Sequence, residues 1–280
     1  MSRFHHRKLA KAVFLHCTAL VVFLLMAFPL YGLLLTSLQP ESVIRSRELS
    51  FIPQTIYLDH FRALLVEGHI VPLREGLLNS TLVSSLTAVF CLIVGLPAAY
   101  ALSRLRVPGR NGILAALVSV YFLPTTIFLI PMFVILVRWG IDDTVFSLVL
   151  AYGGFVLPFV IWILKTFIDR LPREVEEAAE LDGCSHRLVM LRIVFPMARS
   201  GVLAAFIFAF ILSWVEFLTP LIFTSNLKMT TVALGMFRST IDIQVGQQAA
   251  AAVLTLLPVT LLMMVFQRLI TQVLMAGADR

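Results

Sequence analysis

Six runs of about 20 apolar residues constrain this chain most, because each is long enough to cross a lipid bilayer as a helix. They cover approximately residues 12–37, 79–103, 112–137, 144–168, 201–223 and 247–267. Helix is the expected form, since lipid offers no partner for unpaired backbone groups. The chain is only 14% charged, whereas soluble globular proteins are about 25% charged. We therefore predict an all-α membrane protein, a single polytopic domain over residues 1–280 with six transmembrane helices.

The lysines and arginines indicate how these helices are oriented. With the N-terminus in the cytoplasm, 15 of the 22 Lys and Arg residues lie on cytoplasmic segments and 7 on outer segments. Such an excess is typical of cytoplasmic loops, so both termini are expected in the cytoplasm. The net charge of +6 then reflects topology, and nucleic acid is not expected as a partner.

The cysteines and the first apolar run carry no further signal. Cys17, Cys91 and Cys184 have no metal-ligand spacing, so we expect neither a metal site nor a structural disulfide. The first run lacks a small-residue cleavage site and is expected to be a retained span.

The segment between the fourth and fifth spans is charged instead of apolar. It reads EEAAELDGCSHRLVMLRIVFP from Glu176 to Pro196. Residues 173–182 fit a helix, Gly183 can end it in a left-handed conformation, and Ser185 can cap a second helix. A helix this short is unstable alone. From the residues alone it is either a solvated loop or a docking helix for a cytoplasmic partner.

This segment resembles the EAA loop of ABC importer permeases, whose pattern is E-A-A, three residues, G, nine residues, then I-x-L-P. Glu177, Ala178, Ala179, Gly183, Ile193 and Pro196 match at the right spacing, and Phe195 replaces the usual leucine. Three further stretches, LLNSTLVSSLTAVFCLIVGLPAAYALSRLRVPGR, FIPQTIYLDHF and AAAVLTLLPVTLLMMVFQRLI, are similar to the carbohydrate-uptake type, the group of the maltose permease G subunit.

The resemblance implies a bacterial inner-membrane subunit that pairs with a second, similar permease and with two copies of a cytoplasmic ATPase. An external solute-binding protein would deliver a sugar. ATP and Mg²⁺ would be used by the ATPase, because this chain lacks a phosphate-binding loop; it would itself bind no cofactor and be no enzyme. The coupling segment would span about 172–199, with these candidate residues: Glu176, Glu177, Ala178, Ala179, Asp182, Gly183, Ile193 and Pro196.

Two other regions are candidate sites. Glu216 lies in the fifth span, where a charge costs about 3 kcal/mol on insertion scales. Glu216 and Trp214, which lies in the same span, are candidates for lining the translocation pathway. The outer segment 224–246 is too long for a simple turn. The resemblance implies that Asn226–Arg238 faces the binding protein, with these candidate contacts: Asn226, Lys228, Met229 and Thr230.

Smaller expectations concern the outer loops. A short helix is predicted near Leu58–Leu65, and Asp142–Asp143 is predicted to cap the fourth span.

Other functions remain open from the sequence. The importer could carry a non-sugar solute such as a glycerophosphodiester. An ion-coupled secondary transporter would need several intramembrane charges and an inverted repeat. A membrane-embedded glycosyltransferase would need a D-x-D metal site, which the sequence lacks.

Overall fold

The computed structural model describes residues 2–46, 51–53, 55–66, 71–237 and 244–278. Within these ranges, the side chains of residues 2–10, 12, 121 and 268–278 are not described. All regular elements in the described ranges are helical, as predicted. The α-helices are α1 (Ser2–Ser37), α2 (Glu41–Ile44), α3 (Asp59–Leu65), α4 (Leu73–Arg104), α5 (Arg110–Ser119), α6 (Thr126–Arg138), α7 (Val145–Ile168), α8 (Arg173–Leu181), α9 (His186–Val189), α10 (Phe195–Met197), α11 (Arg199–Val215), α12 (Leu218–Phe223), α13 (Thr230–Met236) and α14 (Val245–Ala278). The 3₁₀-helix η1 covers Val120–Phe122 and the π-helix η2 covers Met190–Val194.

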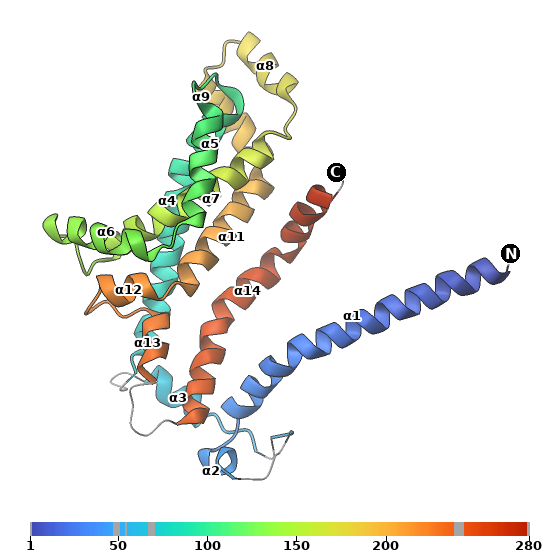
Figure 1. Cartoon of the computed structure of the whole chain (residues 1–280), viewed down its shortest axis with the longest axis vertical. Coiled ribbons are helices and arrows are strands. Elements are labelled where there is room, and N and C mark those ends of the chain that lie inside the picture. Colours follow the sequence, from blue (N-terminus) through green and yellow to red (C-terminus); the bar gives the residue numbers. More distant parts are fainter. Residues whose placement is uncertain (1, 47–50, 54, 67–70, 238–243, 279–280) are drawn as a thin grey trace. The chain divides into compact units, whose positions relative to one another are not determined.

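The chain divides into two compact units. Unit 1 comprises Met1–Val71 and Met236–Leu256, and unit 2 comprises Pro72–Gly235 and Leu257–Arg280. In unit 2, α4 and α7 run side by side and α11 packs against both. Within this unit, α8 lies at one end of the packed helices, whereas α12 and α13 lie at the opposite end (Figure 1).

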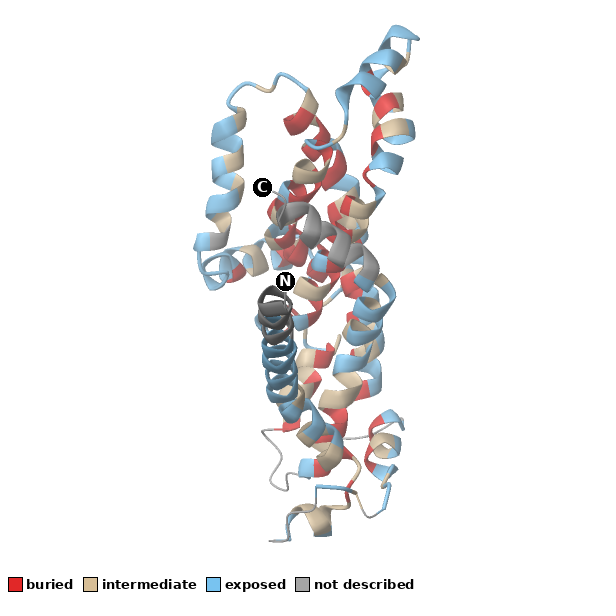
Figure 2. Ribbon diagram, turned by 90° about the vertical axis from the view of Figure 1, so that its right-hand side faces the viewer, coloured by how far each residue is buried: buried red, intermediate tan, exposed pale blue. Residues whose placement is uncertain are grey.

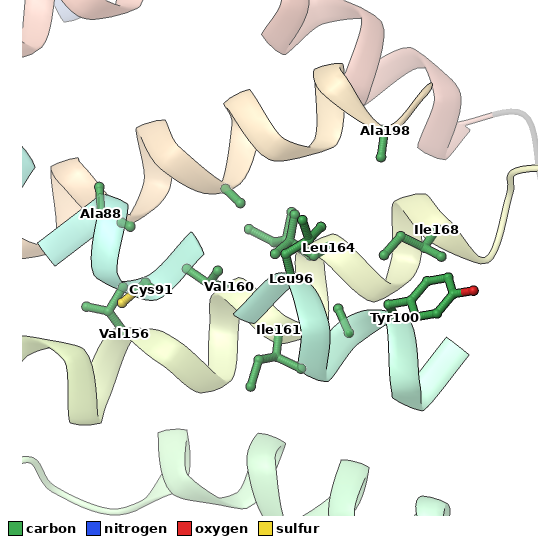
Figure 3. Packing of buried hydrophobic residues seen from close by; sticks show 14 of the residues in the cluster. Ala88, Cys91, Leu96, Tyr100, Val156, Val160, Ile161, Leu164, Ile168 and Ala198 are labelled. Carbon is green, nitrogen blue, oxygen red and sulfur yellow. The ribbon is translucent and has the colours of Figure 1, made fainter. Parts of the chain in front are cut away.

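The core of unit 2 is formed where α4, α7 and α11 meet. Ala88, Cys91 and Leu96 of α4 face Val156, Val160 and Leu164 of α7 (Figure 3). Outside this core, many apolar side chains are exposed. Figure 2 shows how the exposed residues are distributed over the helices. That distribution is expected of a bundle whose outer surface lies in lipid or against another membrane protein.

Four of the six predicted spans form continuous helices. They are α1, α4, α7 and α14, and each is long and apolar enough to cross a membrane within the described ranges. A fifth candidate is a pair of segments, His186–Met197 and Arg199–Val215, that bend by 80° at their junction. The count of six spans stays a prediction.

The predicted span 112–137 is not one helix, which corrects the sequence interpretation. It divides into α5, η1 and α6. Leu123 has an extended backbone, with a ψ of 134°, and the next residue is Pro124. A residue before proline avoids the helical region, so the helix ends there although the composition stays apolar.

The predicted span 201–223 is also broken. α11 ends at Val215, and Glu216 is extended with a ψ of 134°. Pro220 explains the position of the break, because a proline ring clashes with the carbonyl of the residue four positions earlier in a helix. That residue is Glu216, which leaves the helix and relieves the clash.

In unit 1, polar groups fix the start of α14. The Glu41 carboxylate accepts hydrogen bonds from the backbone N–H groups of Val245, at 2.5 Å, and Gly246, at 3.2 Å. His60 of α3 is buried, and a side chain at Gly246 would collide with its ring. The short helix predicted near Leu58–Leu65 is confirmed as α3.

Candidate functional site

The charged segment after α7 folds as its residues predict. Residues 173–181 form α8, with Glu174 and Glu176 in the first turn, where carboxylates complement the helix dipole. Gly183 follows with a φ of +87°, so the predicted left-handed end of the helix is confirmed. Ser185 precedes α9 with an extended backbone, but its side chain makes no capping hydrogen bond. That part of the prediction is wrong.

Beyond the turn, the chain continues through α9, η2 and α10 into α11. Of the two remaining motif residues, Ile193 is half-buried against the core and Pro196 is exposed. The wider turns of η2 hold side chains away from strict α-helical spacing, so the predicted second helix is not a regular one. These elements place the motif's second half directly before the bend into α11.

An ion pair holds α8 against the end of α4. Arg104 Nε donates to Glu176 Oε1 at 2.7 Å, and both side chains are only 7% exposed. Arg104 Nη2 also donates to the carbonyls of Ile168, at 2.8 Å, and Leu171, at 3.0 Å. Removing one partner of a buried pair costs about 3–5 kcal/mol, so Glu176 is committed to this internal contact.

Ser103, the residue before Arg104, takes part in a second polar link between the ends of α4 and α7. Ser103 Oγ and Lys165 Nζ both donate to the Asp169 carboxylate. Burial alone would raise the pKa of Asp169, but these two hydrogen bonds and the positive charges of Lys165 and Arg110 outweigh it and hold that pKa below its usual range. The ends of the two helices are therefore joined independently of α8.

A pocket of about 140 Å³ lies beside the ion pair. The Glu180 carboxylate lies 2.7 Å from His186 Nδ1 across the glycine turn, and Glu177 is exposed. Of the three glutamates that line the pocket, Glu176 is paired with Arg104 and Glu180 with His186, so Glu177 is the one that can receive a basic group from outside the chain. The pocket is lined by Tyr100, Arg104, Leu105, Arg173, Glu176, Glu177, Glu180 and His186.

The outer face of α8 carries the remaining motif residues. Ala178, Asp182 and Gly183 are exposed, and Leu181 is 89% exposed. Ala179 is half-buried and packs against the core of unit 2. Hence the two alanines point in different directions, and only Ala178 belongs to the free face.

Glu216 and Trp214 lie on either side of the break after α11. Glu216 is half-buried, and its carboxylate accepts the backbone N–H of Thr219 at 2.7 Å, at the start of α12. Trp214 is 3% exposed and stacks on Phe210 with ring centroids 5.6 Å apart. Trp214 is therefore buried in this structure and Glu216 is the more accessible member of the predicted pair, and their place in the translocation pathway stays a prediction.

The loop between α12 and α13 is tied to Asp143. The backbone N–H groups of Ser225, Asn226 and Leu227 donate to its carboxylate at 3.0–3.2 Å, and Asn226 Nδ2 donates at 2.7 Å. Asp143 has a φ of +53°. The prediction that this aspartate caps the next helix is wrong, because Thr144 forms the capping box of α7.

The predicted contact residues of this loop are only partly accessible. Asn226 is exposed and Lys228 is half-buried, whereas Met229 and Thr230 are buried. Thr230 N–H donates to Ser80 Oγ of α4 at 2.9 Å. In this structure Met229 and Thr230 anchor the loop to the bundle, and Arg238 lies outside the described residues.

Protonation of Asp143 should release this loop. Partial burial alone would raise the pKa of Asp143, but hydrogen bonds from Asn226, Leu227 and Ser225 outweigh it and hold that pKa below its usual range. The stabilisation is present above the unfolded pKa of about 3.9 and lost as the pH falls through the lower folded value. Hydrogen exchange of these three amides, corrected for intrinsic rates, should show strong protection at neutral pH and its loss in acid.

Two variants give the control. Asp143→Ala should lose the protection at every pH, whereas Asp143→Asn should keep part of it, because asparagine tolerates positive φ and still accepts hydrogen bonds. Equal protection in the alanine variant would show that Asp143 does not hold the loop.

Sequence reasoning missed Arg104 and Asp143 as organising residues. Each binds a segment more than 60 residues away. The available signal was a charged residue beside an apolar run, but the prediction used Arg104 only for topology and Asp143 only as a helix cap.

Comparison of the sequence with known proteins shows which family this chain belongs to. Residues 80–274 match the model described as binding-protein-dependent transport system inner membrane component. The inner membrane ABC transporter permease protein YcjP of Escherichia coli (strain K12) is 32% identical over 264 residues, covering 94% of both proteins. The trehalose transport system permease protein SugB of Mycobacterium tuberculosis is 30% identical over 254 residues, covering 89% of this chain and 91% of SugB.

A further relative and a solved structure agree. The diacetylchitobiose uptake system permease protein DasC of Streptomyces coelicolor is 28% identical and covers 97% of this chain and 98% of DasC. The fold is similar to a bacterial ABC transporter that imports the acidic polysaccharide alginate, with a TM-score of 0.75 at 17% identity over 92% of this chain and 97% of that one. The chain therefore belongs to the binding-protein-dependent transport system inner membrane component family, and is a multi-pass permease component of an ABC importer.

Proposed function

We propose that this chain forms half of the translocation pathway of a sugar importer and that α8 is its docking helix for a cytoplasmic ATPase. The observation that carries the proposal is the outer face of α8. It combines an exposed leucine, a small alanine and a free glutamate on a helix that is anchored from behind. A helix that is held in place and yet leaves apolar surface uncovered is suited to a partner protein.

The proposed assembly follows the resemblance. A second permease subunit completes the pathway, two ATPase subunits dock from the cytoplasm, and a solute-binding protein docks outside. Both termini then lie in the cytoplasm, and six spans cross the membrane. Since α12 and α13 lie at the opposite end of unit 2 from α8 (Figure 1), the Asn226 loop is a reasonable contact for the binding protein.

A sugar is the proposed substrate class because of the relatives. SugB is named for trehalose and DasC for diacetylchitobiose, both of which are disaccharides or their derivatives. Glu216 is the proposed pathway residue of this chain. It interrupts an apolar helix and keeps a partly exposed carboxylate that can bind a sugar hydroxyl.

Substitution of Glu177 tests the docking proposal. This residue is exposed at the pocket beside the Arg104–Glu176 pair and is proposed to accept a hydrogen bond from a basic residue of the ATPase. A hydrogen bond to a charged group contributes about 1.5–3 kcal/mol, so Glu177→Ala should weaken ATPase binding by about tenfold or more. The measurement is binding of the purified ATPase subunit to the permease in nanodiscs.

Glu174→Ala is the matched control. Glu174 is an equally charged, exposed residue of α8, but it does not line the pocket. Its loss should change binding by less than about twofold. Equal weakening by both substitutions would indicate a general charge effect and no specific contact of Glu177.

A further inference from the structure

The most buried contact between α8 and the bundle is an ion pair, with Ala179 adding partly buried apolar packing. Within α8, all of whose residues are described, Glu176 alone is buried. The helix has nine residues, too few to be stable on its own in water. The contact that holds Glu176 is therefore the main link between α8 and the membrane helices, beside a longer hydrogen bond from Arg173 Nη2 to the Ser103 carbonyl at 3.5 Å.

Arg104 makes that contact and reaches three elements at once. Its guanidinium binds Glu176 of α8, the Ile168 carbonyl at the end of α7 and the Leu171 carbonyl in the connection to α8. Arg104 itself is the last residue of α4. A planar guanidinium with several fixed donors imposes one geometry on its partners, whereas apolar side chains can slide past one another.

Stability alone gives no reason for a buried ion pair at this position. Apolar residues of similar volume often stabilise a protein as well or better, because burying two charges is costly. What the pair adds is a fixed orientation between α8 and the ends of α4 and α7. The pocket beside the pair is also lined by Glu177, the exposed glutamate of the proposed docking face, so the joint and that face share this pocket.

We propose that Arg104 and Glu176 are positioning residues that form a rigid joint, so that α8 moves together with the ends of α4 and α7. This inference rests on the proposed docking of an ATPase to α8. Movement of the docked ATPase is then transmitted to two helices of the core. Without the joint, α8 can swing on its two connections while α4 and α7 stay in place.

The joint can be tested by a distance measured within this chain. Nitroxide labels are placed at Glu174→Cys on α8 and Arg106→Cys after α4, both exposed positions, in a chain whose own cysteines are replaced. The complex with its ATPase subunits is studied in nanodiscs by double electron–electron resonance, without nucleotide and with ATP and vanadate. With the joint intact, the distance distribution should be the same in both states.

Glu176→Ala should change that result. The ATPase should remain bound, but the mean distance should shift by about 2 Å or more between the two states, or its distribution should broaden. Glu176→Gln keeps a neutral acceptor for Arg104 and should give a smaller change. Ser103→Ala removes only the hydrogen bond from Ser103 to Asp169, which does not involve α8, and should leave the distance unchanged by nucleotide.

A double variant separates positioning from stability. Arg104→Met with Glu176→Met replaces the pair by apolar side chains and should restore normal amounts of folded chain, yet still show the nucleotide-dependent shift. The proposal is overturned if Glu176→Ala or the double variant keeps the parent distance in both states. Absence of bound ATPase from the parent complex would instead refute the proposed function.

Discussion

Leu181→Asp is expected to abolish stable association of the ATPase subunits with this permease. Leu181 is 89% exposed, so a polar residue there leaves the fold intact. A docked partner would bury it, and burying a leucine contributes about 2 kcal/mol. An aspartate in that contact adds a desolvation cost, so affinity should fall by about a hundredfold or more. Co-purification of the ATPase with the tagged permease measures the effect.

Ala178→Trp tests the same face of α8 by adding a large side chain, which should block docking of the ATPase sterically. Ala178 is exposed, whereas Ala179 packs partly against the core, so Ala178 is the position where a large side chain meets only the partner. Leu58→Asp is the control, since Leu58 is 60% exposed and lies in a predicted outer segment. Normal ATPase recovery with both Leu181→Asp and Ala178→Trp would mean that α8 is a solvated loop helix.

Gly183→Val is expected to stop uptake while the chain remains inserted in the membrane. Gly183 has a φ of +87° and open space around the position of a Cβ atom, so the strain comes from the backbone and not from a collision. A left-handed conformation costs a residue with a side chain about 1–2 kcal/mol, and a β-branched residue more. The turn should adopt negative φ and misplace α8 relative to α9.

Gly140→Val provides a control with the same backbone strain. Gly140 has a φ of +68°, and it too has nothing near a Cβ atom, but it lies in the connection between α6 and α7. Uptake of the sugar carried by the partner binding protein should survive this change. Gly183→Asn should be milder than Gly183→Val, because asparagine tolerates positive φ. Equal uptake in both valine variants would contradict a special role for the turn.

The sequence predicted the parts of this molecule that depend on local pattern. α4 and α7 follow from uninterrupted apolar runs, and α8 follows from helix-forming residues that end at Gly183. Pro124 and Pro220 give a local cause for the breaks at Leu123 and Glu216, but they do not predict them, because other prolines lie inside the continuous helices α4 and α7. Apolar composition concealed the breaks, because it continues unchanged through both of them.

The contacts of the candidate site could not be predicted in the same way. Glu176 and Glu177 are adjacent and chemically equal, yet one is buried against Arg104 and the other is exposed. The choice depends on where the end of α4 lies in space, which no local spacing contains. For the same reason the sequence interpretation named both Ala178 and Ala179 as coupling residues without distinguishing them, although only Ala179 packs against the core.

Site-specific photocrosslinking at Leu181 tests the central claim most directly. A photoreactive amino acid at this position in the assembled importer should form a covalent adduct with the ATPase subunit, identified by mass spectrometry of the crosslinked peptides. The same residue at Leu58 should give no ATPase adduct. If the Leu181 variant is inserted and still supports uptake, yet crosslinks only to lipid or to nothing, α8 is not the docking helix.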